Sequence, residues 1–351
     1  MKDSLGMPVF LGQDRRRAIR FLVGAGGVAA LALVGLAGWP ASAEESTGAA
    51  ARLMVQDDPK AGRAVLLVRG KTAWVYRYGN EVDLPHYILF SPTGQQLTIE
   101  QAEPYPHHRS FWFADMVQLA GERPASFYNA WYSRVDKNDP RSPFKDRIRH
   151  LKLTVEQPTG QGSLVIHKEL LWEIDQQKPV LDEQRTMKVL DLGDGEYFLD
   201  IVFTLRASYG EVTFLSDASH YAWPYLRMTP EFSVQKGGVI TNSEGQVNQK
   251  ETDMQVAKWV DYSNTVAGRT EGVAVFSHSD NEHPHRWLTR DYGTFGPRRA
   301  DEKNGKKFTL KQGETIKTRI GVLVHKGDVQ QGRVAQRYQQ YLDGTLRPAS
   351  P

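Results

Sequence analysis

The stretch Tyr197-Phe-Leu-Asp-Ile-Val-Phe-Thr-Leu205 decides the fold, because it is the most apolar extended segment of the chain. Successive residues of a strand face opposite sides. Leu199 and Ile201 therefore share one side, while Phe198 and Val202 share the other. Apolar groups on both sides predict a central strand that is covered on each face.

Shorter extended segments precede and follow this strand, and turns rich in Gly and Pro separate them. Gly70-Lys71, for example, lies between two such segments and predicts a hairpin. The expected strands cover residues 64–68, 73–78, 87–90, 95–99, 147–156, 164–174, 180–190, 273–276, 307–310 and 315–325.

A helical pattern is expected near the C-terminal end. Asp328 is a suitable N-cap for this helix, and Gly344 can end it. Its apolar stripe comprises Val334, Tyr338, Tyr341 and Leu342.

Many short strands followed by one helix predict an all-β protein, a large antiparallel β-sandwich with one C-terminal α-helix. A galactose-mutarotase-like supersandwich is the first expectation, and a jelly roll is the second. No repeat of 20–50 residues is evident, which argues against a propeller or solenoid. We expect one domain over residues 63–345, followed by a tail at 346–351.

Residues 1–43 have the features of a signal peptide. Arg16-Arg17 precede an uncharged run, and Ala41-Ser42-Ala43 reads as a cleavage site. The adjacent arginines suggest twin-arginine export. An ordinary secretory signal or an uncleaved anchor stays open, because the run is long enough to span a bilayer. Cleavage predicts a periplasmic or secreted protein that begins with a flexible linker at 44–62.

The composition narrows the classes of partner. The chain has 44 Lys and Arg against 41 Asp and Glu, and no basic run, so we expect no nucleic-acid partner. Because there is no cysteine, an exported form must be held by its core or by a bound ion. After the leader no apolar run reaches membrane-spanning length, so no membrane contact is expected. The oligomeric state is not predicted.

Three stretches contain six of the ten histidines, each near Pro and Trp. They are 103–113, 216–225 and 277–293. Histidines that serve only the core would be expected to scatter, so we hypothesise that loops at one end of the sandwich bring the stretches together. The alternative is that these are surface histidines beside aromatic core strands.

The residues in and near these stretches suit acid–base chemistry on a sugar. The catalytic candidates are His107, His108, Arg109, Asp217, His220 and Arg290. The ligand-binding candidates are Trp112, Trp259, Asp261, His278, Trp287, Asp291 and Tyr292. Histidine transfers protons near neutral pH, and arginine stabilises a developing oxyanion. Aromatic faces suit the C–H faces of a sugar. The alternative is that Trp and Tyr fill the sandwich core.

A divalent metal stays open as a cofactor. Zinc requires three or four ligands such as His, Asp or Glu. His283-Pro-His285 is a near-minimal pair that could join the histidines named above, but no HExxH spacing appears. The sequence alone therefore leaves the metal question undecided.

Several of these segments together resemble the bacterial PmoA-like family, whose function is uncertain. They are Tyr105-Pro-His107-His108-Arg109-Ser110, Trp259-Val-Asp261-Tyr262, Trp287-Leu-Thr-Arg290-Asp291-Tyr292-Gly293 and Gly321-Val-Leu-Val-His325-Lys-Gly327. The resemblance covers about residues 87–341. Tyr105 replaces the family's usual acid and Ser110 its usual Gly, so a ligand or base at the acid position would be lacking here.

The family resemblance implies an exported or cytosolic β-sandwich protein of sugar-utilising bacteria. It supplies no catalytic residues to carry over. The methane-oxidising subunit of the same name is an integral membrane protein, so we reject methane oxidation for this chain.

The first hypothesis is an exported carbohydrate-active protein, a hydrolase, lyase or epimerase that uses His/Arg acid–base chemistry on a sugar or oxidised sugar. The alternative is a non-catalytic glycan-binding or envelope structural β-sandwich protein. Both predict a small-molecule or oligosaccharide ligand. A paired-carboxylate signature is absent, which argues against an ordinary retaining or inverting glycosidase.

Overall fold

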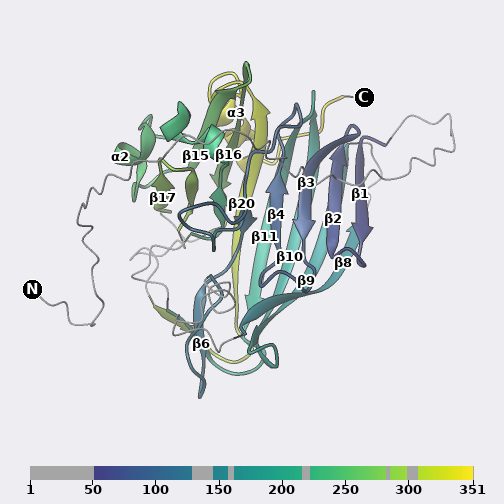
Figure 1. The fold of residues 1–351 in the computed structure, drawn as a ribbon, viewed down its shortest axis with the longest axis vertical. Coiled ribbons are helices and arrows are strands. Elements are labelled where there is room, and N and C mark those ends of the chain that lie inside the picture. The colour runs from purple at the N-terminus through teal and green to yellow at the C-terminus, as the bar shows by residue number, and fades with distance from the viewer. Residues whose placement is uncertain are drawn as a thin grey trace, which may run out of the picture. The chain divides into compact units, whose positions relative to one another are not determined.

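The apolar stretch at 197–205 forms the middle of strand β11 (Glu196–Arg206) in the computed structural model (Figure 1). The structure describes residues 51–128, 145–156, 162–215, 222–281, 285–298 and 307–350, all within the unit Ala49–Pro351. β11 pairs on one side with β10 and on the other with β20. It is therefore a central strand, as predicted.

Three antiparallel sheets contain the described strands. Sheet I has the order β1 (Leu53–Asp58), β2 (Arg63–Val68), β3 (Lys71–Arg77), β4 (His86–Leu89), β5 (Phe111–Trp112), β13 (Tyr225–Arg227), β18 (Thr294–Pro297) and β17 (Trp287–Arg290). Sheet II has the order β14 (Val239–Asn242), β15 (Trp259–Val266), β16 (Arg269–Ser277), β20 (Thr315–Lys326), β11, β10 (Lys178–Gly193), β9 (Ser163–Ile174) and β8 (Arg147–Glu156). Sheet III has the order β19 (Phe308–Leu310), β12 (Val212–Phe214), β6 (Met116–Leu119) and β7 (Ala125–Ser126).

Short helical elements complete the described fold. They are two 3-10 helices (Pro230–Phe232 and Val234–Lys236), helix α2 (Asn248–Thr252) and helix α3 (Val334–Leu342). The result confirms the predicted all-β antiparallel sandwich with a C-terminal helix.

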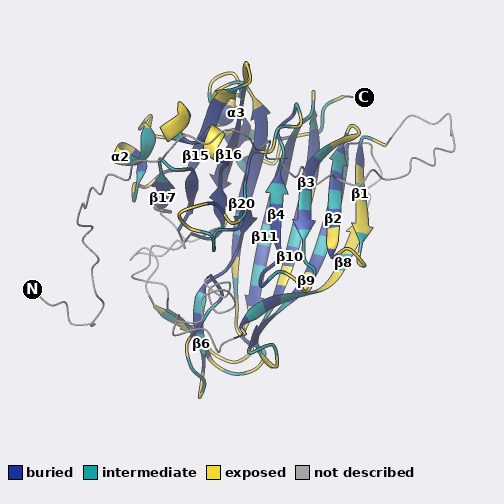
Figure 2. Ribbon diagram, in the orientation of Figure 1, coloured by how far each residue is buried: buried dark blue, intermediate teal, exposed yellow. Residues whose placement is uncertain are grey.

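The core lies between sheets I and II. One apolar cluster joins Trp74 and Tyr87 of sheet I to Leu199, Ile201 and Phe203 of sheet II. Figure 2 shows that β11, β16 and β20 are largely buried, whereas the edge strands β1 and β8 are largely exposed. Each buried side chain of this size contributes about 1.5–3 kcal/mol by leaving water.

Helix α3 covers the opposite face of sheet II. Its Tyr341 ring lies 5.0 Å from that of Phe198, and its Tyr338 ring lies 5.4 Å from that of Phe276. The apolar stripe predicted for the helix thus faces sheet II, but the predicted start of the helix is wrong. Asp328 caps a turn by accepting the N–H groups of residues 330 and 331, and α3 begins six residues later at Val334.

Both predicted boundaries of the domain need correction. Strand β1 lies inside the expected linker, where Leu53 pairs with Val68 of β2. Its sequence has few apolar residues because most of this edge strand faces solvent. At the other end, the expected tail packs on the domain: Leu346 is buried, and the N–H of Ala349 donates to the carbonyl of Asp191.

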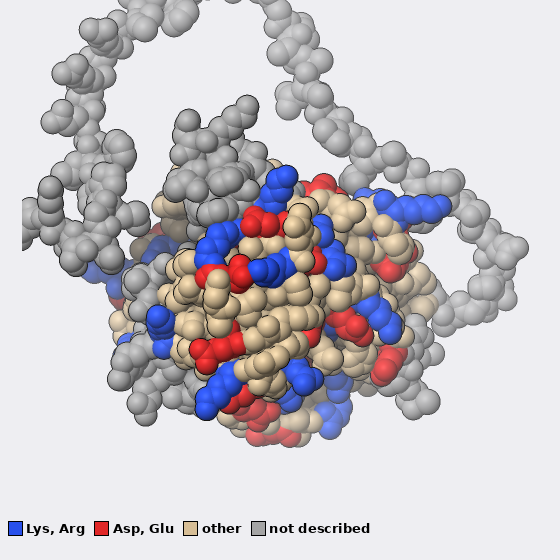
Figure 3. All heavy atoms as spheres, turned by 90° about the horizontal axis from the view of Figure 1, so that it is seen from below, with Lys and Arg blue, Asp and Glu red and all other residues tan. Residues whose placement is uncertain are grey.

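Positive and negative side chains are mixed on the surface, as the nearly balanced composition predicts. Figure 3 shows Lys and Arg interspersed with Asp and Glu on the face that is in view. No helix among the described residues is long and apolar enough to cross a membrane. The predicted leader lies outside the described residues, so export stays a prediction.

Truncation after Asp328 is expected to lower the free energy of unfolding by several kcal/mol. It removes Val334, Tyr338 and Tyr341, which are buried against sheet II and each contribute about 1.5–3 kcal/mol. Urea unfolding followed by circular dichroism measures the loss. A chain that ends at Ala349 is the matched control, and equal stability of the two truncated chains would contradict the packing of α3.

Candidate functional site

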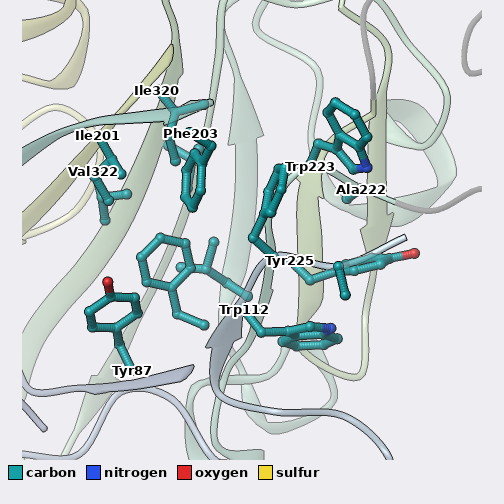
Figure 4. Close-up of a cluster of buried hydrophobic side chains, with 14 of the residues drawn as sticks. Tyr87, Trp112, Ile201, Phe203, Ala222, Trp223, Tyr225, Ile320 and Val322 are labelled. Carbon is teal, nitrogen blue, oxygen red and sulfur yellow. The ribbon is translucent and has the colours of Figure 1, made fainter. Parts of the chain in front are cut away.

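Strands β5 and β13 build the floor of the candidate site. Trp112 pairs with Tyr225 across these strands, and their rings stack 5.0 Å apart. Because neighbours on a strand alternate, Phe111 and Leu226 face the opposite side of the sheet, and all four side chains belong to one buried apolar cluster. Figure 4 shows Trp112 and Tyr225 side by side and extending away from Ile201 and Phe203 of sheet II.

The loop before β5 brings two histidines over this floor. The backbone holds the loop in place, because the N–H of Ile99 donates to the carbonyl of Arg227 and that of Gln101 to the carbonyl of His108. The N–H of Arg227 in turn donates to the carbonyl of Ser110. The loop is therefore fixed to β13 at both of its ends.

His108 lies within a group of aromatic rings. Its ring centroid is 5.1 Å from Tyr105, 4.6 Å from His107 and 5.4 Å from Trp112. The rings of Tyr225 and Tyr292 lie 6.4 Å away. We call Tyr105, His107, His108, Trp112, Tyr225 and Tyr292 the His108 cluster.

The His108 cluster is open to solvent on its loop side. Tyr105 is 38% exposed, and His107, His108 and Tyr292 are partly exposed. Trp112 and Tyr225 are buried beneath them. A ligand can therefore contact the upper rings, with the indole and phenol of the floor below.

Two arginines give this site positive charge. The Arg227 guanidinium carbon lies 4.6 Å from the Tyr292 ring centroid, and this arginine donates to the carbonyls of Tyr292 and Glu103. Arg109 is also buried, and its Nη2 lies 3.9 Å from Asp83 Oδ2. Both arginines affect the titration of His108.

Burial and positive charge keep His108 neutral. Burial, followed by the charges of His107, Arg227 and Arg109, lowers the pKa of His108 to about 2. Its Nδ1 lies 3.4 Å from the Thr294 hydroxyl. Burial raises the pKa of Tyr292 and lowers that of Arg227. At neutral pH the imidazole is therefore an uncharged hydrogen-bonding group.

The structure thus brings together residues from all three His-rich stretches, because Tyr225 is the last residue of the second. Of the sequence-predicted residues, His107, His108, Trp112 and Tyr292 lie in the cluster, and Arg109 affects His108 through its charge. Asp217, His220 and His283 lie outside the described residues. Their roles stay predictions.

Arg290 and Asp291 contact α2 and its neighbour Asp253, and the charge of Arg290 also opposes the rise that burial causes in the pKa of Tyr292. The Nη1 of Arg290 pairs with Asp253 Oδ2 at 2.5 Å, just after α2. A carboxylate oxygen of Asp291 accepts the N–H of Gln249 within α2. Edge strand β17 and its turn place both residues against α2, and their catalytic and ligand-binding roles stay predictions.

Trp287 is a core residue and not the wall of the site. It is fully buried, and its Nε1–H donates to the carbonyl of Ala257 at 2.7 Å. Its indole has neither an open face nor a free donor for a ligand. The prediction for Trp287 failed because Trp also serves sandwich cores.

Three further ligand-binding candidates lie on the α3 side of sheet II. Trp259 packs in the cluster formed with α3 and lines a pocket of about 480 Å³. A carboxylate oxygen of Asp261 lies 2.7 Å from Nε2 of buried His325. His278 lies 3.1 Å from Asp280 and 4.9 Å from the Tyr341 ring. The expected single site with the His108 cluster is therefore wrong for these residues.

The metal hypothesis gains no ligand set in the described part of the chain. There, no three His, Asp or Glu side chains gather closely enough to hold an ion. His285 is buried, and its Nδ1 lies 2.8 Å from the carbonyl of Arg298. The described residues thus offer no donor set on which to assign a metal.

Sequence analysis missed two residues of the site on β13. Tyr225 stacks on Trp112, and Arg227 lies under Tyr292. Their spacing was the available signal, because residues two apart on a strand share a face. In Tyr225-Leu-Arg227, an aromatic ring and a cation therefore point to the same side.

The chain matches a family of unknown function (DUF6807) over residues 63–339. It belongs to that family. The match does not test the resemblance to the PmoA-like family, which stays a prediction. No curated protein shows significant sequence similarity to the chain.

Several solved carbohydrate-active enzymes are similar in structure to this chain at low sequence identity. The GH36 α-galactosidase AgaB from Geobacillus stearothermophilus is 10% identical over 80% of this chain and 42% of its own, with a TM-score of 0.45. An α-galactosidase from Lactobacillus brevis is 9% identical over 82% and 42%, with a TM-score of 0.43. A polysaccharide lyase is 10% identical over 81% and 34%, with a TM-score of 0.36. This chain spans less than half of each of these structures, and such similarity assigns no activity.

Proposed function

We propose that the His108 cluster is the site of a carbohydrate-active protein. The observation that carries the proposal is the stack of His108 among partly exposed Tyr105 and Tyr292 above Trp112. Aromatic rings offer flat apolar faces to the C–H groups of a sugar, and their polar edges can bind hydroxyls. The neutral imidazole can donate or accept hydrogen bonds there.

The reaction class that fits this site is proton transfer at a sugar carbon or hydroxyl, as in a lyase or epimerase. His107 and His108 are the candidate proton carriers, and the positive charge of Arg227 can stabilise a developing oxyanion. The six residues of the His108 cluster are aromatic residues and histidines, whereas ordinary glycoside hydrolysis uses two carboxylates. Elimination and epimerisation are the reactions that proton transfer by these histidines would serve.

A non-catalytic glycan-binding role is the second candidate, and the pKa of His108 favours it. An imidazole with a pKa of about 2 is a weak base, and efficient bases have pKa values near the working pH. A negative charge that arrives with the ligand would raise this pKa, because it offsets the positive charges around His108. The two candidates therefore differ in what happens after binding.

A panel of sugars and sugar acids, measured by calorimetry and by product analysis, tests the proposal. We expect Tyr105→Ala to weaken binding about three- to tenfold, the value of one aromatic contact. Tyr105 is exposed, so the change should leave the fold intact. Tyr209→Ala is the matched control, because Tyr209 is an exposed tyrosine of the segment after sheet II strand β11.

Equal binding by the Tyr105 and Tyr209 variants would contradict the placement of the site. Products formed by the unaltered protein would support the enzyme, whereas binding without turnover would support the glycan-binding role.

A further inference from the structure

Arg227 is a buried cation without a carboxylate partner. It is 3% exposed, and among the described residues no Asp or Glu forms an ion pair with it. Its Nη atoms donate to two carbonyls and approach the hydroxyl of Thr294, while its Nε–H has no acceptor in the described part of the chain. Within that part, the positive charge is therefore solvated by dipoles.

Two other buried arginines of the chain each lie beside a carboxylate. Arg185, which is equally buried, lies 2.6 Å from Glu183, and Arg109 lies 3.9 Å from Asp83. Buried arginines are almost always paired, because a charge removed from water needs compensation. Neutralisation is not available to Arg227, since a guanidinium keeps its proton in proteins.

A second unpaired donor lies in the same site. The Nε1–H of Trp112 is buried without an acceptor among the described residues, although a buried indole N–H usually finds one. Trp112 forms the floor of the His108 cluster, and His108 itself carries no charge at neutral pH. Three elements contribute the groups that face His108. The loop contributes Tyr105, His107 and Arg109, and β13 contributes Tyr225 and Arg227. Thr294 of β18 and Tyr292 of the preceding turn complete the set.

We propose that the ligand is an acidic sugar whose single negative charge compensates Arg227. This inference rests on the proposed carbohydrate function and names the substrate class. The sugar ring would lie against Tyr105 and Tyr292, and its acid group would face the loop at His107-His108 above Arg227. One unpaired cation calls for one negative charge, which a carboxylate of a hexuronic acid or a sulfate ester supplies.

Calorimetric titrations with matched sugars test the charge directly. Galacturonate, galactose 6-sulfate and galactose are titrated into the unaltered protein at pH 7. We expect the acidic sugars to bind about ten- to a hundredfold more tightly than galactose, because opposite charges attract each other strongly in a partly buried site. The two acidic arms show whether carboxylate or sulfate is preferred. Raising the salt concentration should weaken binding of the acids and leave that of galactose unchanged.

The variants assign the charge to its residue. Arg227→Met should remove the preference for acids, while Arg227→Lys should keep part of it. Arg206→Met is the matched control, because it removes one exposed arginine from sheet II and should keep the full preference.

The possible outcomes are distinguishable. Galactose that binds as tightly as the acids would overturn this inference and leave the proposed function standing. Absence of binding by every sugar would overturn both. Should Arg227→Met fail to fold, the comparison of acidic and neutral sugars on the unaltered protein still decides the inference.

Discussion

Replacement Glu183→Gln is expected to destabilise the protein by about 3–5 kcal/mol, the usual loss when one partner of a buried ion pair is removed. Glu183 is 1% exposed between the two sheets. It accepts hydrogen bonds from Arg185 and from the Nε1–H of Trp172 at 2.9 Å. One carboxylate oxygen of Glu183 binds Trp172 and the other binds Arg185. A Gln at this position would lose the negative charge and one of the two acceptor oxygens.

The loss is large because a second cation lies beside the pair. The Nζ of buried Lys168 is 4.9 Å from the ring centroid of Tyr76 and 5.0 Å from that of Tyr87. Burial lowers the pKa of Lys168, and the Glu183 charge opposes that effect. With Gln at 183, Arg185 and Lys168 would both lack a neighbouring anion in the core.

Glu169→Gln provides the matched control for this prediction. Glu169 lies on β9 next to Lys168, but its side chain is exposed. Such surface changes usually stay within about 0.5 kcal/mol. Urea unfolding of the two variants measures the difference, and a similar free energy of unfolding for both would refute the role of Glu183.

Replacement His108→Ala is expected to reduce turnover of an acidic sugar about 10²–10⁴-fold, the usual contribution of a general acid or base. The acid group of the ligand would offset the charges of Arg227 and Arg109, which hold the pKa of His108 low after burial. The pKa of His108 would therefore be higher in the complex than in the free protein. Because His108 is partly exposed, its loss should leave the fold intact.

His167→Ala is the matched control, because His167 is a half-exposed histidine of β9 in the other sheet. Its turnover should equal that of the unaltered protein. Circular dichroism of both variants checks the fold. A His108→Ala variant with unchanged turnover would exclude His108 as a proton carrier.

The fold could be predicted from sequence where strands are buried. In β11 the apolar residues on both faces predict a central strand, and the strand does pair on both of its sides. Strand β1 could not be found in the same way, since an edge strand exposes most of its side chains and resembles a linker in composition. The start of α3 was misplaced because Asp328 makes the bonds of a cap in a turn before the helix.

The candidate site could be predicted only in part. His107 and His108 were found because loop histidines stand out in composition. Arg227 was missed, since a lone arginine on a short strand gives no motif, and its importance depends on the carboxylate that is missing around it. Trp259 and Asp261 were grouped wrongly with the cluster because sequence does not show which face of sheet II they occupy.

A crystal structure of the protein with galacturonate tests the binding of an acidic sugar to the His108 cluster most directly. We predict the sugar ring against Tyr105 and Tyr292, with its carboxylate near His107-His108 above Arg227. Galacturonate bound instead in the pocket beside Trp259, with the His108 cluster empty, would contradict the account.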